Sequence, residues 1–484
     1  MVVKKYQKVY REMYEQWYRE NQAYREQVAA DENRLAYHLM PETGWLNDPN
    51  GLCQVNGVYH IYYQYTPFEP TGELKLWGHC TTQDFVHYRQ CEPAVYPDQD
   101  FDAHGVYSGS AFVENGLIHY FYTGNVKYFD RDDYDYILTG RGSNTIHMTS
   151  RDGFHFSEKE LLLTNGDYPA DMSGHVRDPK VIRRADGYYM VLGARDTAGK
   201  GLVLIYRSGD LTGWEYHGRI TTREAFGYMW ECPDLFVLDG RLCLICCPQG
   251  VPQRGVDFAN VHQCTAVMLD YDFAPGEYVL EDMAKVRMVD RGCDFYAPQT
   301  FEDEEGRRIL IGWMGIPDPD YTNPTVEAGW QHALTLPREL HIADGRLVQT
   351  PLKELQALRR NPRVWEVGSL NRAGERGLVY ELEADFEHCR PMTMTLRSGV
   401  TLSWKEGLLT LDLGPCGSGR TSRSVELDRL EHLQIFSDTS SLEVFVNGGR
   451  EVFTTRVYGR EGGICLEGCD ARVTLYDLEG FCLS

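Results

Sequence analysis

Three carboxylates occupy equivalent positions in a pattern that repeats along this sequence. Asp48, Asp178 and Glu231 each stand nine residues before the glycine of an X-Gly turn, although they are far apart in the chain. If the repeats surround a common axis, these acids meet, and like charges brought together in a partly desolvated place are costly. Each acid alone could simply begin a strand or cap a turn, but their common position favours a functional site.

Carboxylates that converge in this way are suited to the hydrolysis of glycosides. One acid attacks or stabilises the anomeric carbon, a second protonates the leaving oxygen, and a third can hydrogen-bond sugar hydroxyls. A calcium or magnesium site is the competing interpretation of three acids. Proline and aromatic neighbours such as Trp45, Pro49 and Trp230 suit a rigid sugar platform better than a flexible cation loop. We therefore expect a small-molecule sugar substrate, no metal and no cofactor.

Five similar segments must position these residues. Each has a polar start, an apolar run, an X-Gly turn and a second apolar run, which is a strong signal for a β-hairpin. Hairpins that repeat at this period predict a five-bladed β-propeller, in which the first strand of each blade surrounds the axis. A stack of independent sandwiches fits less well, because its strands would not restart at the same distance from a turn. The turn glycines are Gly57, Gly116, Gly187, Gly240 and Gly306.

The flanking regions differ from these repeats. Residues 4–30 predict a helix, because Tyr6, Tyr10, Met13 and Trp17 recur at helical spacing, and we expect this stripe to dock on the body of the same chain. Near the other end, an Asn-Gly-Gly turn between two apolar runs predicts a hairpin over 442–453, typical of a β-sandwich. We therefore predict an all-β chain with four parts: an N-terminal helix (1–34), a propeller catalytic domain (35–345), a linker (346–364) and a sandwich (365–484).

Composition narrows the classes of partner. The chain has 484 residues, with 48 Lys and Arg against 71 Asp and Glu, for a formal net charge of −23. This balance argues against nucleic acid and anionic membrane surfaces as partners. No apolar run reaches the length of about 18 residues that a membrane span needs, and the N-terminus has no apolar core of signal-peptide type. We expect a cytoplasmic protein; the oligomeric state is not indicated.

The residues around the three acids resemble a known family. Trp45-Leu46-Asn47-Asp48-Pro49-Asn50-Gly51 resembles the W-x-N-D-P-N-G motif of the invertases, glycoside hydrolase family 32. Arg177-Asp178-Pro179 and Glu231-Cys232-Pro233-Asp234 are similar to two further elements of that family. The resemblance implies a propeller followed by a sandwich and a retaining β-fructofuranosidase activity. Other matching segments are Tyr63-Gln64-Tyr65, Trp77-Gly78-His79, Ser108-Gly109-Ser110, Phe295-Tyr296-Ala297-Pro298-Gln299 and Gly312-Trp313-Met314.

The resemblance also implies a role for each site residue. Asp48 is expected to be the nucleophile that forms a fructosyl intermediate, and Glu231 the general acid and then the general base. Asp178 is expected to bind fructose hydroxyls, with Arg177 fixing its charge state. We expect the neighbouring negative charges to raise the pKa of Glu231. Trp77 and Trp313 could instead be core aromatics. The implied substrate-binding residues are Trp45, Leu46, Asn47, Gln64, Trp77, Tyr107, Ser108, Arg177, Tyr296 and Trp313.

The choice of fructoside stays partly open. Tyr37-His38-Leu39-Met40-Pro41 after an N-terminal helix resembles the bacterial intracellular sucrose-6-phosphate hydrolases of that family. The missing export signal argues against the hydrolysis of fructan polymers. We therefore expect hydrolysis of sucrose or sucrose 6-phosphate, with a fructan exo-hydrolase or a fructosyltransferase as alternatives on the same site. A non-catalytic sugar-binding propeller belongs to a different class; it predicts the loss of at least one of the three acids, and none is lost.

Overall fold

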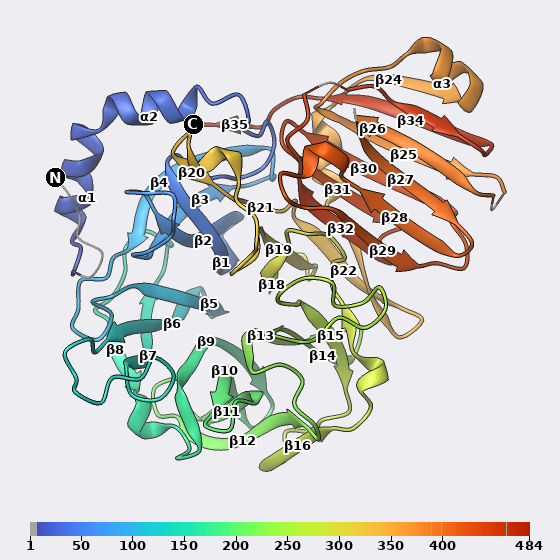
Figure 1. Cartoon of the computed structure of the whole chain (residues 1–484). Helices are drawn as coiled ribbons and strands as arrows, with labels where there is room; N and C mark the ends of the chain where they lie inside the picture. Colours follow the sequence, from blue (N-terminus) through green and yellow to red (C-terminus); the bar gives the residue numbers. More distant parts are fainter. Residues whose placement is uncertain (1–6, 389, 398, 461) are drawn as a thin grey trace.

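Seven β-sheets make up most of the part of the chain that the structure describes (Figure 1). The computed structural model describes residues 7–388, 390–397, 399–460 and 462–484. Five sheets from the first two-thirds of the chain surround a common centre, and the two sheets of the last third lie beside them. No helix within the described ranges is both long and apolar enough to cross a bilayer.

Each of the five central sheets begins with one of the predicted hairpins. The first and second strands pair antiparallel in every case, with the expected glycine in the turn between them. At the first turn, Asn56 and Gly57 have φ angles of 53° and 75°, the left-handed conformation that a two-residue hairpin turn requires. The sequence-based prediction of five hairpins is therefore confirmed.

The strands of the five central sheets follow the chain in order, apart from a few short additions at the edges. The first two sheets contain β20 (Trp330–Gln331), β1 (Gly44–Val55), β2 (Val58–Thr66), β3 (Leu76–Thr82), β4 (His87–Val95) and β35 (Cys482–Leu483), then β5 (Val106–Glu114), β6 (Leu117–Lys127), β7 (Arg141–Ser150) and β8 (Glu160–Leu163). The third contains β16 (Gly276–Leu280), β12 (Glu215–Thr222), β11 (Gly201–Ser208), β10 (Gly187–Asp196) and β9 (Met172–Arg184). The last two contain β13 (Met229–Leu238), β14 (Arg241–Gln249), β15 (Thr265–Leu269) and β17 (Arg287–Met288), then β18 (Tyr296–Glu302), β19 (Arg308–Met314), β21 (Ala333–Leu334), β22 (Arg338–Ala343) and β23 (Arg346–Pro351).

The five first strands form a closed ring. β1, β5, β9, β13 and β18 each lie against the first strand of the next sheet, and β18 lies against β1. The short strand β20, which lies between β19 and β21 of the fifth sheet in the chain, pairs parallel with β1 through Gly44 and Trp330. The C-terminal strand β35 pairs with β4 at the other edge of the same sheet. β20 and β35, which come from later parts of the chain, therefore complete the first sheet.

The N-terminal region contains two helices within the range predicted as one. α1 (Arg11–Glu20) and α2 (Gln22–Ala29) meet at Asn21. Trp17 is buried and packs edge-on against Phe68, with ring centroids 5.2 Å apart. Tyr10 does not follow the predicted stripe, because it precedes α1 and 45% of it is exposed; Tyr14 takes the buried position instead. Tyr6, also assigned to that stripe, lies outside the described residues.

The last third of the chain forms two facing sheets around their own apolar core. The predicted hairpin over 442–453 is confirmed as the pair β31 and β32. A short helix, α3 (Val367–Ala373), packs at one end of this region. One sheet contains β24 (Arg359–Glu366), β34 (Ala471–Leu478), β25 (Tyr380–Phe386), β30 (His432–Asp438), β31 (Ser441–Val446) and β32 (Glu451–Arg456), and the other contains β29 (Ser422–Glu426), β28 (Leu408–Asp412), β27 (Val400–Lys405), β26 (Met392–Arg397) and β33 (Cys465–Glu467).

The range 346–364, expected to be a linker, is mostly strand. Its first part is β23, which pairs with β22, and its last part is β24, which pairs with β34 of the facing sheets. Only the 3₁₀ helix η4 (Lys353–Leu358) separates them. The short helical segment η4 is therefore flanked on both sides by residues that strand pairing holds in place. The other 3₁₀ helices are η1 (Asn165–Asp167), η2 (Met283–Lys285), η3 (Pro324–Val326) and η5 (Gly414–Gly417).

Buried charges join the ring of sheets to the facing pair of sheets. Arg338, the first residue of β22, donates to Glu443 Oε2 at 2.6 Å and to Asp290 Oδ2 at 3.1 Å. His38, ahead of β1, lies 2.8 Å from Asp438 Oδ2 and 3.1 Å from Glu443 Oε1. Burial alone would lower the pKa of His38, but hydrogen bonds and charges from both acids outweigh it and raise the pKa to about 9.

Candidate active site

The pairing of the first strand is interrupted at the same place in all five central sheets. A β-bulge breaks the regular alternation of faces and re-aims the side chains beside it. Asp178, Cys232 and Ala297 have φ angles of 64°, 47° and 44°, a conformation that costs about 1–3 kcal/mol for a residue with a side chain and is concentrated at functional sites. The residues without a direct partner are Asn47-Asp48, Tyr107-Ser108, Asp178-Pro179, Cys232-Pro233 and Ala297-Pro298.

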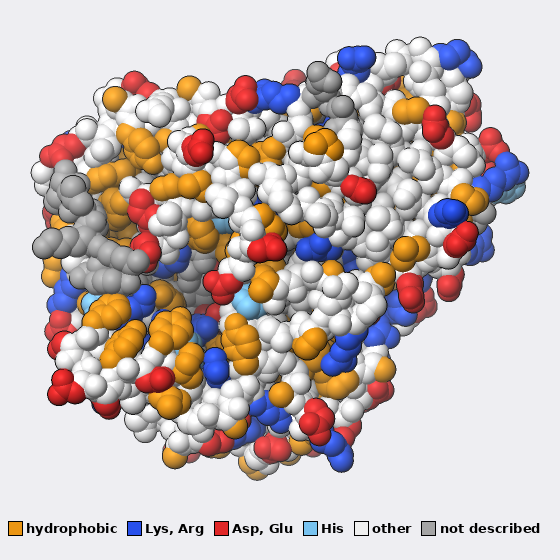
Figure 2. Space-filling model, viewed as in Figure 1, with side chains coloured by type: hydrophobic (Ala, Val, Ile, Leu, Met, Phe, Trp, Pro, Cys, Tyr) orange, Lys and Arg blue, Asp and Glu red, His pale blue; other side chains and the backbone are white. Residues whose placement is uncertain are grey.

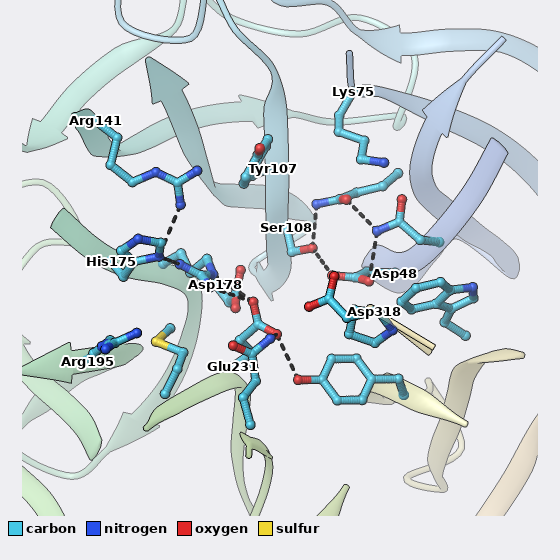
Figure 3. A pocket seen from close by; sticks show the side chains of 18 of the residues that line it. Asp48, Lys75, Tyr107, Ser108, Arg141, His175, Asp178, Arg195, Glu231 and Asp318 are labelled. Carbon is cyan, nitrogen blue, oxygen red and sulfur yellow. Dashed lines mark hydrogen bonds and ion pairs between the residues drawn. The ribbon is translucent and has the colours of Figure 1, made fainter. Parts of the chain in front are cut away.

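These interruptions border one cavity of about 490 Å³ (Figure 3). Asp48, Asp178 and Glu231 all line it. The thiol of Cys232 lies 3.6 Å from Asp48 Oδ2 and 3.6 Å from Asp178 Oδ2, so these two oxygens are at most twice that distance apart. Glu231 is the residue before Cys232 and faces the same cavity. The structure therefore brings together three acids that are up to 183 positions apart in the sequence.

A closed ring of hydrogen bonds holds Asp48. Asn47 Nδ2 donates to Asp48 Oδ1 at 2.9 Å and to Gln64 Oε1 at 2.5 Å. Gln64 Nε2 donates to Ser108 Oγ at 2.7 Å, and Ser108 Oγ donates to Asp48 Oδ2 at 2.5 Å. Trp45 Nε1 donates to Asn47 Oδ1 at 2.8 Å and fixes the orientation of that amide. Both oxygens of the Asp48 carboxylate are therefore held in place by side chains from the first two sheets.

Charges of both signs act on Asp48. Burial raises its pKa, the hydrogen bonds from Ser108 and Asn47 lower it, and the charge of Glu231 raises it again. Lys75 lines the cavity and lowers the pKa of Asp48 through its own charge. The Lys75 ammonium lies 4.8 Å from the centre of the Trp45 ring, and burial lowers its pKa to about 8. The net result is a raised pKa for Asp48.

Glu231 is held by an arginine, an amide and a phenol. Arg177 Nε and Nη2 both donate to Glu231 Oε1, at 2.9 and 2.7 Å. Gln249 Nε2 and Tyr296 OH each donate to Glu231 Oε2 at 2.7 Å. Burial would raise the pKa of Glu231, but the charge of Arg177 and the hydrogen bonds from Tyr296 and Arg177 outweigh it and lower the pKa.

Asp178 has less compensation. Its Oδ2 accepts a hydrogen bond from the backbone N–H of Cys232 at 2.8 Å, and its own N–H donates to Thr123 Oγ1 at 3.0 Å. Burial raises the pKa of Asp178 to about 7; the charge of Arg177 opposes this, and those of Glu231 and Asp48 add to it. The pKa of Asp178 is therefore raised and that of Glu231 is lowered, although both carboxylates line one cavity. Carboxylates whose pKa values are separated in this way are expected where acid and base chemistry takes place.

Two sequence-based expectations about this charge arrangement need correction. The pKa of Glu231 is lowered, not raised, because Arg177 lies against it and neutral donors cover its other oxygen. Arg177 was expected to fix the charge state of Asp178, its neighbour in the chain. Its guanidinium hydrogen-bonds Glu231 instead, and it acts on Asp178 only through its charge.

Two expected substrate contacts also lie outside the cavity. Leu46 is fully buried in the apolar core shared by the first and fifth sheets. Trp77 is fully buried among Tyr62, Tyr120 and Tyr122, and its Nε1 donates to the backbone oxygen of Tyr107 at 3.1 Å. Both are core residues, which for Trp77 is the alternative that the sequence left open. The expected residues that do line the cavity are Trp45, Asn47, Gln64, Tyr107, Ser108, Arg177, Tyr296 and Trp313.

Half of the residues that line the cavity were not predicted from the sequence. His175 was detectable, because it stands two residues before Arg177 and side chains two apart on a strand share a face. Arg195 and Gln249 stand 8 and 9 residues after the turn glycines Gly187 and Gly240, near the ends of the second strands β10 and β14, so nearly the same count from the turn leads to both. Loop residues offered no such signal. The cavity-lining residues that were missed are Lys75, Tyr136, Ile137, Arg141, His175, Arg195, Tyr228, Met229, Gln249, Pro317 and Asp318.

Comparison with known proteins assigns most of the chain to one family. Residues 38–351 match the model of the glycosyl hydrolases family 32 N-terminal domain, and residues 354–474 match that of the family 32 C terminal. The sucrose-6-phosphate hydrolase of Bacillus subtilis (strain 168) is 37% identical over 443 residues, which cover 89% of this chain and 90% of that protein.

Solved structures show the same fold. The sucrose-6-phosphate hydrolase from Lactobacillus gasseri superposes with a TM-score of 0.88 at 28% identity, covering 99% of both chains. A variant of the Bombyx mori family 32 β-fructofuranosidase in complex with sucrose superposes with a TM-score of 0.79 at 27% identity, covering 97% of this chain and 99% of that one. The mostly β architecture is the family fold of a propeller followed by a sandwich. The chain belongs to glycosyl hydrolases family 32 and is a glycoside hydrolase.

Proposed function

We propose that this enzyme hydrolyses the fructosyl bond of sucrose or sucrose 6-phosphate with retention, through a covalent fructosyl intermediate. The observation that carries the proposal is the meeting of Asp48, Asp178 and Glu231 in one cavity around the thiol of Cys232. The names of the relatives, which include sucrose-6-phosphate hydrolases and a β-fructofuranosidase with bound sucrose, support the choice of substrate.

In the first step, the carboxylate of Asp48 attacks the anomeric carbon of the fructosyl unit. The glycosidic C–O bond breaks, and Glu231 donates its proton to the leaving oxygen. The hydrogen bonds from Asn47 and Ser108 orient Asp48 for this attack. In the second step, Glu231 takes a proton from water, the water oxygen attacks the same carbon, and Asp48 leaves. Two displacements at one carbon give retention.

The proton that Glu231 donates must first reach it. In the empty cavity, Asp178 has the raised pKa, of about 7, and Glu231 the lowered one, so near neutral pH Asp178 is protonated in about half of the molecules and holds a proton in preference to Glu231. Fructose hydroxyls that hydrogen-bond to Asp178 favour its ionised form. Substrate binding therefore favours transfer of the proton from Asp178 to Glu231. Glu231 then donates this proton to the leaving oxygen.

Residues beside Asp48 and on the fifth sheet bind the fructosyl unit. Trp45 and Trp313 offer flat apolar faces, with ring centroids 5.8 Å apart. The Nε1 of Trp313 is buried and has no hydrogen-bond partner among the described residues, so this ring offers the sugar its apolar surface. Tyr107 and Ser108 come from the second sheet, beside Asp48. Gln64 joins Asn47 to Ser108 and keeps their amide and hydroxyl groups in fixed orientations.

The test is a comparison of kcat/KM for sucrose, sucrose 6-phosphate, raffinose and inulin. Turnover of the first two, with the β-anomer of fructose released first, is expected. Faster turnover of inulin would favour the fructan exo-hydrolase, and accumulation of oligofructosides at high sucrose would favour the fructosyltransferase. Binding of sucrose with no turnover of any of the four would favour the sugar-binding propeller and overturn the proposal.

The architecture is proposed on the same basis. We take the five central sheets as the five blades of one propeller domain, with the predicted bounds 35–345 extended to the end of β23 at 351, and residues 1–34 as a helical segment docked on it. The closed ring of first strands supports this division. The sandwich follows at 365–484, and strand pairing of β23 and β24 favours a linker shorter than the predicted 346–364, centred on η4.

A further inference from the structure

Two arginines of the cavity have no acidic partner. Arg141 is the first residue of β7, and Arg195 lies near the end of β10. Within the described part of the chain, neither makes an ion pair, whereas their neighbour Arg177 is paired with Glu231. The Nε atom of each is buried and has no hydrogen-bond partner among the described groups. Two guanidinium charges in the cavity wall are therefore uncompensated.

Aromatic rings hold the flat faces of these two guanidiniums. The Arg141 guanidinium lies 5.1 Å from the centre of the Tyr136 ring, and that of Arg195 lies 5.0 Å from the centre of the Tyr228 ring. Such stacking fixes the plane of the guanidinium, and because Nε is buried in both arginines, the Nη atoms are the donors left to meet a ligand in the cavity. Tyr136 belongs to the loop between β6 and β7, part of a surface region rich in hydrophobic side chains over β5–β8 (Figure 2).

His175 holds Arg141 without adding a charge. Its Nδ1 accepts hydrogen bonds from Arg177 Nη1 at 2.9 Å and from Arg141 Nη1 at 3.2 Å, and its Nε2 donates to the backbone oxygen of Tyr136 at 3.1 Å. Burial, with the charges of Arg177 and Arg141, lowers the pKa of His175 to about 2, so the ring is neutral at physiological pH. The positive charge of this wall is thus carried by arginines alone.

The position of this wall relative to the acids identifies what it can contact. Arg141, His175 and Arg195 lie on the side of the cavity where Glu231 stands, whereas Lys75 lies on the side of Asp48 and Ser108 (Figure 3). Glu231 is the proposed proton donor to the leaving oxygen, so the leaving glucosyl group lies beside it. The chain as a whole has a net charge of −23, so this wall carries positive charge in a protein that is acidic overall.

We propose that Arg141 and Arg195 form a phosphate subsite for the leaving group, and that the enzyme therefore prefers sucrose 6-phosphate to sucrose. The unprimed number in that name places the phosphate on C6 of the glucosyl unit. Two guanidiniums suit a phosphate, because their Nη groups can donate charge-assisted hydrogen bonds to its oxygens. This inference rests on the proposed function, in which the same glucosyl unit leaves from Glu231.

Lys75 is the competing ligand for a phosphate. It is the other cation of the cavity without an ion pair among the described residues, but it lies over Trp45 and acts on Asp48. That position is on the fructosyl side of the bond to be cleaved. A phosphate on Lys75 would therefore belong to the fructosyl unit, which is not the unit phosphorylated in sucrose 6-phosphate. The same experiment can distinguish the two assignments.

The kinetic test compares kcat/KM for sucrose 6-phosphate and for sucrose in matched variants. Loss of one charge-assisted contact to phosphate should lower the ratio of the two values by about 10- to 100-fold in Arg195→Gln and in Arg141→Gln. Lys75→Met should lower both values and leave the ratio unchanged. The control is Arg207→Gln on β11, an exposed arginine that pairs with Asp186 and does not line the cavity. The inference would be overturned if the ratio is unchanged in both arginine variants, or if it falls only in Lys75→Met.

A binding test separates this inference from the proposed function. Calorimetry with glucose 6-phosphate, glucose and inorganic phosphate needs no turnover. It therefore also gives a result if the enzyme cleaves neither sucrose nor sucrose 6-phosphate. We expect glucose 6-phosphate to bind more tightly than glucose or inorganic phosphate, and this advantage to fall in Arg195→Gln. Equal binding of glucose and glucose 6-phosphate would refute the subsite even if sucrose is hydrolysed. Inorganic phosphate binding as tightly as the sugar phosphate would show an anion site unconnected with the leaving group, and would also refute it.

Discussion

Arg177 donates two hydrogen bonds to a single oxygen of Glu231, from Nε at 2.9 Å and from Nη2 at 2.7 Å. This contact lowers the pKa of the acid that must donate a proton to the leaving group. Asp178, buried nearby with a pKa raised to about 7, holds a proton in preference to Glu231 at and below that pH. Binding of a fructoside therefore has to redistribute a proton within the carboxylate cluster before the bond can break.

Replacing Glu231 by Gln should lower kcat by about 10²- to 10⁴-fold for sucrose, the usual range for a general acid. A fructoside with an activated leaving group needs no proton in the first step, so its formation of the intermediate should be much less affected. Pre-steady-state measurement of the first product checks this. Glu215→Gln on β12, at an exposed position away from the cavity, is the control. Equal losses for both substrates would argue that Glu231 is not the acid.

The pH dependence of kcat/KM reports the proton of the cluster in the free enzyme. Activity should fall as pH rises through about 7, because Asp178 then loses the proton that substrate binding passes to Glu231. In Asp178→Asn, only Glu231 can hold that proton, and its pKa is lowered beside Arg177. The falling limb should therefore move to lower pH in this variant. A limb that stays near pH 7 would assign the proton to another group.

The charge of Lys75 lowers the pKa of Asp48, which must be ionised to attack. In Lys75→Met the pKa of Asp48 should rise, so a smaller fraction is ionised at a given acidic pH. The acid limb of kcat/KM should accordingly move to higher pH. Lys75→Arg keeps the charge and should leave the limb nearly in place. Identical acid limbs in the methionine and arginine variants would contradict the electrostatic role.

His38 should make the stability of the fold depend on pH. Its pKa is raised to about 9 in the folded chain, against 6.5 for an ordinary histidine. A raised folded pKa stabilises the protein fully below pH 6.5, and this contribution is lost as pH rises through about 9. At 1.36 kcal/mol per pH unit the loss is about 3 kcal/mol. Urea unfolding between pH 6 and 9 measures it.

The slope of stability against pH in this range should be absent in His38→Gln, whatever the overall stability of that variant. His432→Gln, which removes a more exposed histidine that contacts Asp385, is the matched control and should keep the slope. A slope that persists in His38→Gln would show that another buried group is responsible.

The sequence was sufficient for the features set by local rules. Turn glycines such as Gly57 and Gly240 mark hairpins because a tight turn needs a left-handed backbone, and counting back from them locates Asp48, Asp178 and Glu231. Leu46 was misassigned because it lies between cavity residues in the chain, whereas the bulge after it turns Asn47 and Asp48 inward and leaves Leu46 in the core.

Other features depend on packing between distant segments. Arg141 and Arg195 come from different sheets, and only the closed ring of strands places them on one wall. Arg177 follows Val176 and precedes Asp178, so its chain neighbours suggested the wrong partner; its true partner, Glu231, is 54 residues away. No spacing rule in the sequence indicates which of two nearby acids an arginine will contact.

The nucleophile can be identified by trapping the intermediate. Glu231→Gln should form it from a fructoside with an activated leaving group and hydrolyse it slowly, because general base catalysis is lost. We expect mass spectrometry of the digested protein to find one fructosyl group on the peptide that contains Asp48, and none when Asp48→Ala is added. A fructosyl group on Asp178 or on any other residue, or continued turnover in Asp48→Ala, would contradict the mechanism.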